Sequence, residues 1–225
     1  MGQTLGDVLG FAAGVAISPL PIVAINLILA TPRGRLNGVL FAFGWLVGLG
    51  ALGAVMLAIG GPAGSSTGKE PATWVGGLKT GLGILLLLFA VRQWRRRPAD
   101  ASQAQLPKWM AAIDRFTPVK TLGLGLVLSA ANLKNAPLTI AAGATISASG
   151  IPLGQQVVSL AVFVFIGSLG LLVPLGAFLL LGERARHALS AGKDWAVRHN
   201  TAVMAVLFFV LGLKLLGDGI GILAR

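Results

Sequence analysis

Two polar, proline-bearing turns interrupt long apolar runs of this chain, Ser18-Pro19-Leu20-Pro21 near its start and Asn132-Leu133-Lys134-Asn135-Ala136-Pro137 in its second half. A break in an apolar helix frees backbone groups that hydrocarbon cannot satisfy, so it persists in a membrane only where protein or a water-filled cavity surrounds it. Matched breaks in two halves of a membrane protein are typical of the binding site of a transporter.

The composition around these turns is that of an all-α integral membrane protein. The 225 residues are 55% hydrophobic and 11% charged, and the mean hydropathy is +0.84. A membrane-spanning helix needs about 20 apolar residues. The windows that meet this requirement predict six transmembrane helices at Leu5–Ala30, Leu36–Gly60, Thr73–Val91, Val119–Ala148, Leu153–Leu181 and Thr201–Leu223.

The basic residues predict how these helices are oriented. The net charge is +11, and most Lys and Arg residues lie in the first, third and fifth connections between helices. On the other side are Lys69 and Arg225, and the link between helices four and five has no basic residue. Because cytoplasmic loops collect Lys and Arg, both termini are expected outside. This explanation of the charge requires no nucleic-acid partner.

The order of helices predicts a 3+3 inverted repeat. Residues 1–91 form the expected first repeat, residues 92–118 a basic cytoplasmic connector, and residues 119–225 the second three-helix repeat. Since the two halves insert in opposite directions, helices one and four are expected to be discontinuous at similar depth, near the midplane. The connector is expected to form either an interfacial amphipathic helix, with Trp109, Ile113 and Phe116 on one face, or a solvated loop.

The two turns contain the residue types that start helices. Ser18 is a good N-cap and Pro19 a good first helical residue, and Asn135 is an equivalent N-cap before Pro137. Each helix N-terminus carries roughly half a positive charge. With Lys134 beside them, two such ends are expected to form a site for an anionic group.

Lys134 is the most informative of these residues. A lysine at the bilayer centre costs about 3 kcal/mol on insertion scales, so it needs a partner or a cavity. A place on the substrate path is the favoured explanation, and a structural role, in which it caps helix carbonyls or contacts neighbouring amides, is the alternative. The expected substrate-binding residues are Ser18, Pro19, Pro21, Asn26, Asn132, Lys134, Asn135 and Pro137.

Other charged residues fall inside helices near their outer ends. Lys214 and Asp218 are four residues apart and share a helix face. An ion pair that snorkels toward the interface explains them structurally, and proton coupling through Asp218, Lys214 and Lys79 explains them functionally. Asp7 is expected to be a solvated acid of the first turn.

The residues also exclude several classes of site. The chain has no cysteine, and His187 and His199 lack further ligands nearby, so neither a metal nor a cofactor is expected. There is no Walker sequence and no catalytic arrangement of carboxylates or nucleophiles, which argues against an enzyme. G-x-x-x-G spacings, which bring helix backbones close, occur at Gly44–Gly48, Gly77–Gly81 and Gly217–Gly221.

The stretch Gly14–Ala24, the basic connector and the turn at 132–137 together resemble the GAP/Sap family, named for glycopeptidolipid- and sulfolipid-addressing proteins of mycobacteria. That family is similar in turn to the LysE superfamily of transporters, whose members carry Ser-Pro-Gly-Pro and Asn-Pro-Lys elements in helices one and four. This chain has Leu20 in place of the glycine, and the second proline is displaced to Pro137. These departures weaken any transfer of an amino-acid substrate.

The resemblance implies a multi-pass protein of the bacterial inner membrane that exports an envelope lipid or glycolipid from the cytoplasmic side. It implies membrane lipids and the lipid substrate as partners, and leaves open a homo-oligomer and contacts with proteins that make or export envelope lipids. One alternative is a LysE-type exporter of an amino acid or small metabolite. The other is a non-transporting accessory protein that docks through its basic connector.

Overall fold

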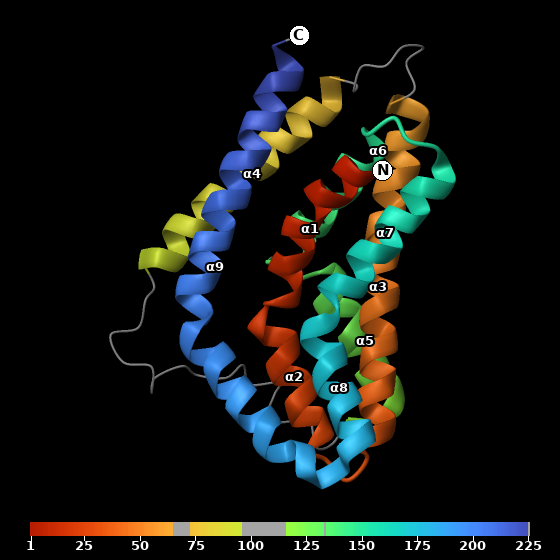
Figure 1. The fold of residues 1–225 in the computed structure, drawn as a ribbon, viewed down its shortest axis with the longest axis vertical. Helices are drawn as coiled ribbons and strands as arrows, with labels where there is room; N and C mark the ends of the chain where they lie inside the picture. The colour runs from red at the N-terminus through yellow and green to blue at the C-terminus, as the bar shows by residue number, and fades with distance from the viewer. Residues whose placement is uncertain (65–72, 96–115, 133, 225) are drawn as a thin grey trace.

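Helices make up the whole described fold (Figure 1). The computed structural model describes residues 1–64, 73–95, 116–132 and 134–224, with side chains described for the same ranges apart from 61–64, 183 and 186–201. The connector helix expected around Trp109 lies outside these residues, as does Lys69. The elements are α1 Gly2–Ala16, α2 Pro19–Leu29, α3 Gly34–Gly64, α4 Thr73–Arg95, α5 Pro118–Ala130, α6 Ala136–Ser147, α7 Leu153–Gly167, α8 Leu169–Leu181, the short 3₁₀ helix η3 Gly182–Ala185 and α9 Arg186–Leu223.

Three of these helices contain segments long and apolar enough to cross a membrane, Gly34–Gly60, Thr73–Arg95 and Ala202–Leu223. Two bent pairs, α1 with α2 at 50° and α7 with α8 at 62°, raise the number of candidate spans to five. The shorter apolar helices α5 and α6 are separated by residues 131–135. The predicted all-helical membrane protein is therefore confirmed, whereas a sixth span and an inverted repeat stay predictions.

The break expected in the first span is present. α1 ends at Ala16, and Ser18 adopts an extended ψ of 119° before α2 begins at Pro19. Pro19 disfavours the helical conformation in the residue before it, and Pro21 has no N–H to continue the helical hydrogen bonds. The chain therefore turns at Ser18, as its proline spacing predicts.

A further break, at Ser168, divides a span that the sequence predicts as unbroken. The Ser168 hydroxyl donates a hydrogen bond to the Val164 carbonyl at 2.6 Å, and such bonding back to the preceding turn bends helices. Flanking Gly167 and Gly170 let this bend lie directly against α1, where a Cβ at position 170 would overlap the Ala16 carbonyl. The prediction of one continuous helix at Leu153–Leu181 is wrong for these reasons.

Glycines also determine which helices approach closely. Gly44 and Gly48 of α3 face the backbone of α5, as their spacing predicts. The equivalent prediction for Gly77–Gly81 and Gly217–Gly221 is wrong, because a Cβ at any of those four positions would meet nothing within 4 Å. The close contact between α4 and α9 is made by other glycines on the same helices, at positions 76, 83, 212 and 219.

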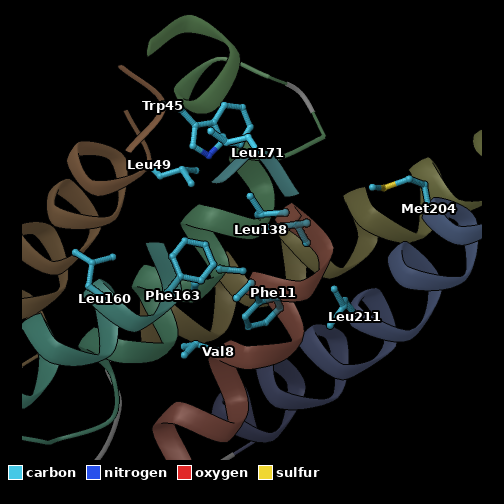
Figure 2. Close-up of a cluster of buried hydrophobic side chains, with 14 of the residues drawn as sticks. Val8, Phe11, Trp45, Leu49, Leu138, Leu160, Phe163, Leu171, Met204 and Leu211 are labelled. Atoms are coloured by element: carbon cyan, nitrogen blue, oxygen red, sulfur yellow. The ribbon is translucent and has the colours of Figure 1, made fainter. Parts of the chain in front are cut away.

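The core joins both halves of the chain. Figure 2 shows apolar side chains that meet from α1, α3, α6, α7, α8 and α9, among them Phe11, Trp45, Leu138 and Phe163, each no more than 1% exposed. The pair α4–α9 lies alongside the other helices, and both termini lie at the same end of the molecule (Figure 1). Which side of the membrane that end faces stays a prediction.

Candidate functional site

The breaks in the first span and between α5 and α6 lie at similar depth. Gly14 of α1 packs against Leu138 of α6, whose Cδ1 would be 2.8 Å from a Cβ at position 14. At 1.5 Å of rise per residue, Gly14 is about 6 Å from Ser18 along its helix and Leu138 about 4.5 Å from Asn135. The contact between α1 and α6 therefore brings these two predicted turns to the same level of the fold.

The bend at Ser168 also lies against the break in the first span. Gly167 lies near the Ala12 carbonyl and Val15, and Gly170 lies against Ala16 and Ile22. The α7–α8 bend is thus seated on the α1–α2 bend through backbone contacts. Sequence reasoning missed Ser168, although a serine between two glycines in the middle of an apolar run is a signal that could have indicated it.

Ser18 and Asn135 occupy the N-cap positions that the sequence predicts, but neither side chain makes a capping hydrogen bond. The helix starts also offer fewer N–H donors than expected. Proline fills two of the first four positions of α2, and a proline nitrogen donates nothing. In α6 the Ala136 and Thr139 N–H groups already bond to the Asn132 and Asn135 carbonyls, at 2.8 and 3.0 Å. Few backbone N–H groups at these two helix starts are therefore free to bind an anion.

Buried side chains at the breaks provide further polar atoms that could bind a ligand. The Ser18 hydroxyl, the Asn132 amide nitrogen, and both amide atoms of Asn135 are buried and make no hydrogen bond with the described residues. Ser18 and Asn135 are both 0% exposed. Each such group costs about 1–3 kcal/mol, and polar atoms left in this state are commonly satisfied by a ligand or water.

Lys134 lies within this polar set. Its backbone N–H donates to the Asn132 side-chain oxygen at 3.0 Å, and the residue is half-buried. Within the described ranges no carboxylate pairs with its ammonium group. The acidic side chains that the structure describes, Asp7 and Asp218, are paired with other lysines.

The remaining predicted site residues have structural roles. The Asn26 amide donates to the Ile22 carbonyl of its own helix at 2.7 Å, so this contact explains it without a ligand. Pro19, Pro21 and Pro137 are buried in the first turns of α2 and α6. Their contribution is the break itself.

A second charged cluster consists of Asp7, Lys79, Lys214 and Asp218, and we call it the outer quartet after the side of the membrane on which the sequence predicts it. The Lys214 Nζ lies 3.1 Å from Asp7 Oδ1 and 3.1 Å from Asp218 Oδ2, and the Lys79 Nζ lies 3.9 Å from Asp218 Oδ2. The predicted pairing of Lys214 with Asp218 is confirmed, whereas the prediction that Asp7 is merely solvated is wrong. Two lysines balance two aspartates, so the quartet ties α1, α4 and α9 together without net charge.

Exposed cations occupy the opposite ends of the helices. Arg95 ends α4, whereas Lys79 of the quartet lies near the start of the same helix. Exposed basic residues also lie at other helix termini: Arg33 and Arg35 at the start of α3, Lys120 in the first turn of α5, and Arg184 in η3. We refer to these helix termini together as the basic end, whereas the quartet is ion-paired and neutral.

Comparisons with known proteins agree over nearly the whole chain. The family model described as "Sap, sulfolipid-1-addressing protein" matches residues 8–221. The chain is also similar to the peptidoglycolipid exporter Gap of Mycolicibacterium smegmatis, at 24% identity over an alignment of 270 positions that covers 96% of this chain and 99% of the relative. No solved structure matches.

Proposed function

Because the chain belongs to the Sap, sulfolipid-1-addressing protein family, we propose that it is a secondary transporter that exports an envelope lipid or glycolipid across the bacterial plasma membrane. Its relative Gap is a peptidoglycolipid exporter. In this proposal the substrate enters from the cytoplasmic side, places an anionic group such as a phosphate, sulfate or carboxylate at the central break, and leaves outward.

The observation that carries the proposal is that Lys134 lacks an ion-pair partner, and the neighbouring Asn132 and Asn135 amide nitrogens lack hydrogen-bond partners, among the described residues. Among the described residues, the Lys134 ammonium group has no carboxylate partner and the Asn135 side-chain amide has no hydrogen bond, and both residues belong to the break between two apolar helices. Ionisable groups at membrane depth are costly and generally line a substrate or ion path. An incoming anion would compensate Lys134 and accept hydrogen bonds from the two asparagines.

The charge of the site favours a lipid over a free amino acid. An amino acid carries an ammonium group as well as a carboxylate, and its ammonium needs an anionic or carbonyl-rich partner. The two carboxylates that the structure describes, Asp7 and Asp218, form ion pairs within the outer quartet. A site with a cation and, in the described part of the chain, no free carboxylate suits a headgroup whose net charge is negative.

Alternating access is the mechanism we propose, with α5 and α6 as the two parts of a sixth span. Packing across the halves supports the inverted repeat, since α3 of the first half lies on α5 of the second, and α7 of the second lies on α1 of the first. Two equivalent contacts of this kind, one from each half, are expected when the repeats are related by a pseudo-twofold axis in the membrane plane. The halves would then rock about their broken helices.

The basic end is proposed to face the cytoplasm, which puts both termini outside. The positive-inside rule supports this orientation. The outer quartet would then close the external ends of α1, α4 and α9. Proton coupling through Asp218, Lys214 and Lys79 is the functional alternative to this structural role.

Reconstitution tests the proposal directly. Purified protein is placed in liposomes with a fluorescent acidic lipid, and arrival of that lipid in the other leaflet is measured with an impermeant quencher. Lys134→Met should abolish movement and Lys134→Arg should retain part of it, while Lys120→Met, which removes an exposed cation at the basic end, should have no effect. A fully active Lys134→Met protein would contradict the site, and movement of an amino acid but no lipid would favour the LysE-type alternative. If the wild-type protein moves neither, the accessory role is favoured.

A further inference from the structure

An apolar groove lies outside the central site, where α4 crosses α9. It has a volume of about 390 Å³ and is lined by Ala90, Val91, Trp94 and Arg95 of α4 and by Ala205, Val206 and Phe209 of α9. The two alanines are 5% and 3% exposed and form its floor, whereas the larger side chains stand out beside them. The groove exists because small residues at the crossing lie between large ones.

The groove ends at charged residues. Arg95 lines it at the last position of α4, and Arg92 stands one turn earlier, also exposed. From Ala90 to Arg95 the helix rises about 7.5 Å. The apolar slot therefore ends at Arg95, with Arg92 part of the way along the same helix. Acyl chains contact any apolar surface of a membrane protein without a net hydrophobic gain. Selective binding therefore depends on the shape of the slot and on the arginines.

We propose that this groove binds an anionic glycerophospholipid of the leaflet at the basic end, with one acyl chain along the alanine floor and the phosphate on Arg95 and Arg92. The planar guanidinium group pairs with phosphate oxygens through two parallel hydrogen bonds. The site is separate from the central break, because none of its lining residues belongs to α1, α2, α5 or α6.

A second copy of the chain fits this surface less well. In a twofold contact the same patch meets itself, so Arg95 and Arg92 of one copy would approach those of the other. Like charges at short range oppose such an arrangement. The positive end of the groove thus selects a negatively charged lipid over a homodimer.

Photolabelling in liposomes tests the proposal. The probes are phosphatidylglycerol and phosphatidylcholine with a photoreactive acyl chain, and labelled positions are mapped by mass spectrometry. Phosphatidylglycerol should label the segments around Trp94 and Phe209, and phosphatidylcholine should label them at most weakly. Arg92→Gln and Arg95→Gln should each lower phosphatidylglycerol labelling about fivefold.

The matched control uses two equally exposed valines on one helix. Val206→Trp fills the groove and should abolish labelling, while Val210→Trp, one turn away and also 56% exposed, should leave it unchanged. If Val206→Trp fails to fold, Phe209→Ala is the second test. It removes one wall of the groove and should weaken labelling. Equal labelling by both lipids, labelling that survives Val206→Trp, or crosslinking to a second copy would overturn the proposal. Since Lys134→Met should keep the labelling, failure here is distinguishable from failure of the export proposal.

Discussion

The outer quartet makes a quantitative prediction, since its two aspartates are not equivalent. Asp218 is the carboxylate beside Lys79, whose side chain is 8% exposed, whereas Asp7 pairs with Lys214, which keeps Asp218 as a second partner. Asp218→Asn therefore leaves a buried ammonium group without a carboxylate. Asp7→Asn leaves every lysine of the quartet with one.

The distances give the magnitudes. Two unit charges about 4 Å apart attract by about 4 kcal/mol at an effective dielectric constant of about 20. Hydration of Asp218, whose side chain is 36% exposed, offsets part of this attraction, so Asp218→Asn should cost about 3 kcal/mol. Asp7→Asn removes a contact between two groups that are each 36% exposed and should cost about 1 kcal/mol.

The assay is the unfolding midpoint of the detergent-purified protein. For a chain of this size the two costs correspond to losses of about 6–12 °C and about 2–4 °C. Adding Lys79→Met to Asp218→Asn removes the stranded charge and should restore most of the loss. Equal midpoints for the two aspartate variants would refute the reasoning. If Asp218→Asn were as stable as the wild type but inactive in transport, proton coupling would be the better account of this residue.

Three further predictions rest on burial, on packing and on the distribution of charge. Asn135→Ala should raise the unfolding midpoint, because it removes two buried atoms that each cost about 1–3 kcal/mol, and should lower lipid export in the liposome assay. Gly48→Leu should abolish recovery of monodisperse protein by gel filtration because its side chain would enter α5, while Gly50→Leu, which meets nothing within 4 Å, should not. A cysteine at position 3 should react with an impermeant maleimide in intact cells and one at position 35 only after lysis; the reverse pattern would invert the orientation.

Local chemistry explains which parts of the fold could be predicted. Membrane-length apolar runs and the proline pair after Ser18 act within a few residues, so the helical class and the first break were readable from the sequence. The bend at Ser168 also depends on seating Gly170 against α1, a contact between distant segments. A serine alone does not break an apolar helix, and the sequence pattern therefore favoured a continuous span.

The same distinction applies to the charges. Lys214 and Asp218 share one helix face, so their pairing followed from spacing alone. The partner of Asp7 lies at the far end of the chain, and helical periodicity carries no information about which helices meet. The glycine spacings had the same limit, because G-x-x-x-G identifies a close-packing face only when another helix is known to cover it.

The three breaks differ in length and in whether their polar groups have hydrogen-bond partners, and we infer different roles for them from these differences. The bends at Ser18 and Ser168 are short and lie against each other through glycine and backbone contacts, and Ser168 bonds to its own helix. The break between α5 and α6 is longer, spanning residues 131–135, and it alone among the three contains a charged residue. We therefore expect the paired bends to act as the pivot between halves and Lys134 with Asn135 to hold the substrate. On this reasoning Ser168→Ala should alter the rate of transport while Asn135→Ala alters substrate affinity, which a concentration series in the liposome assay separates.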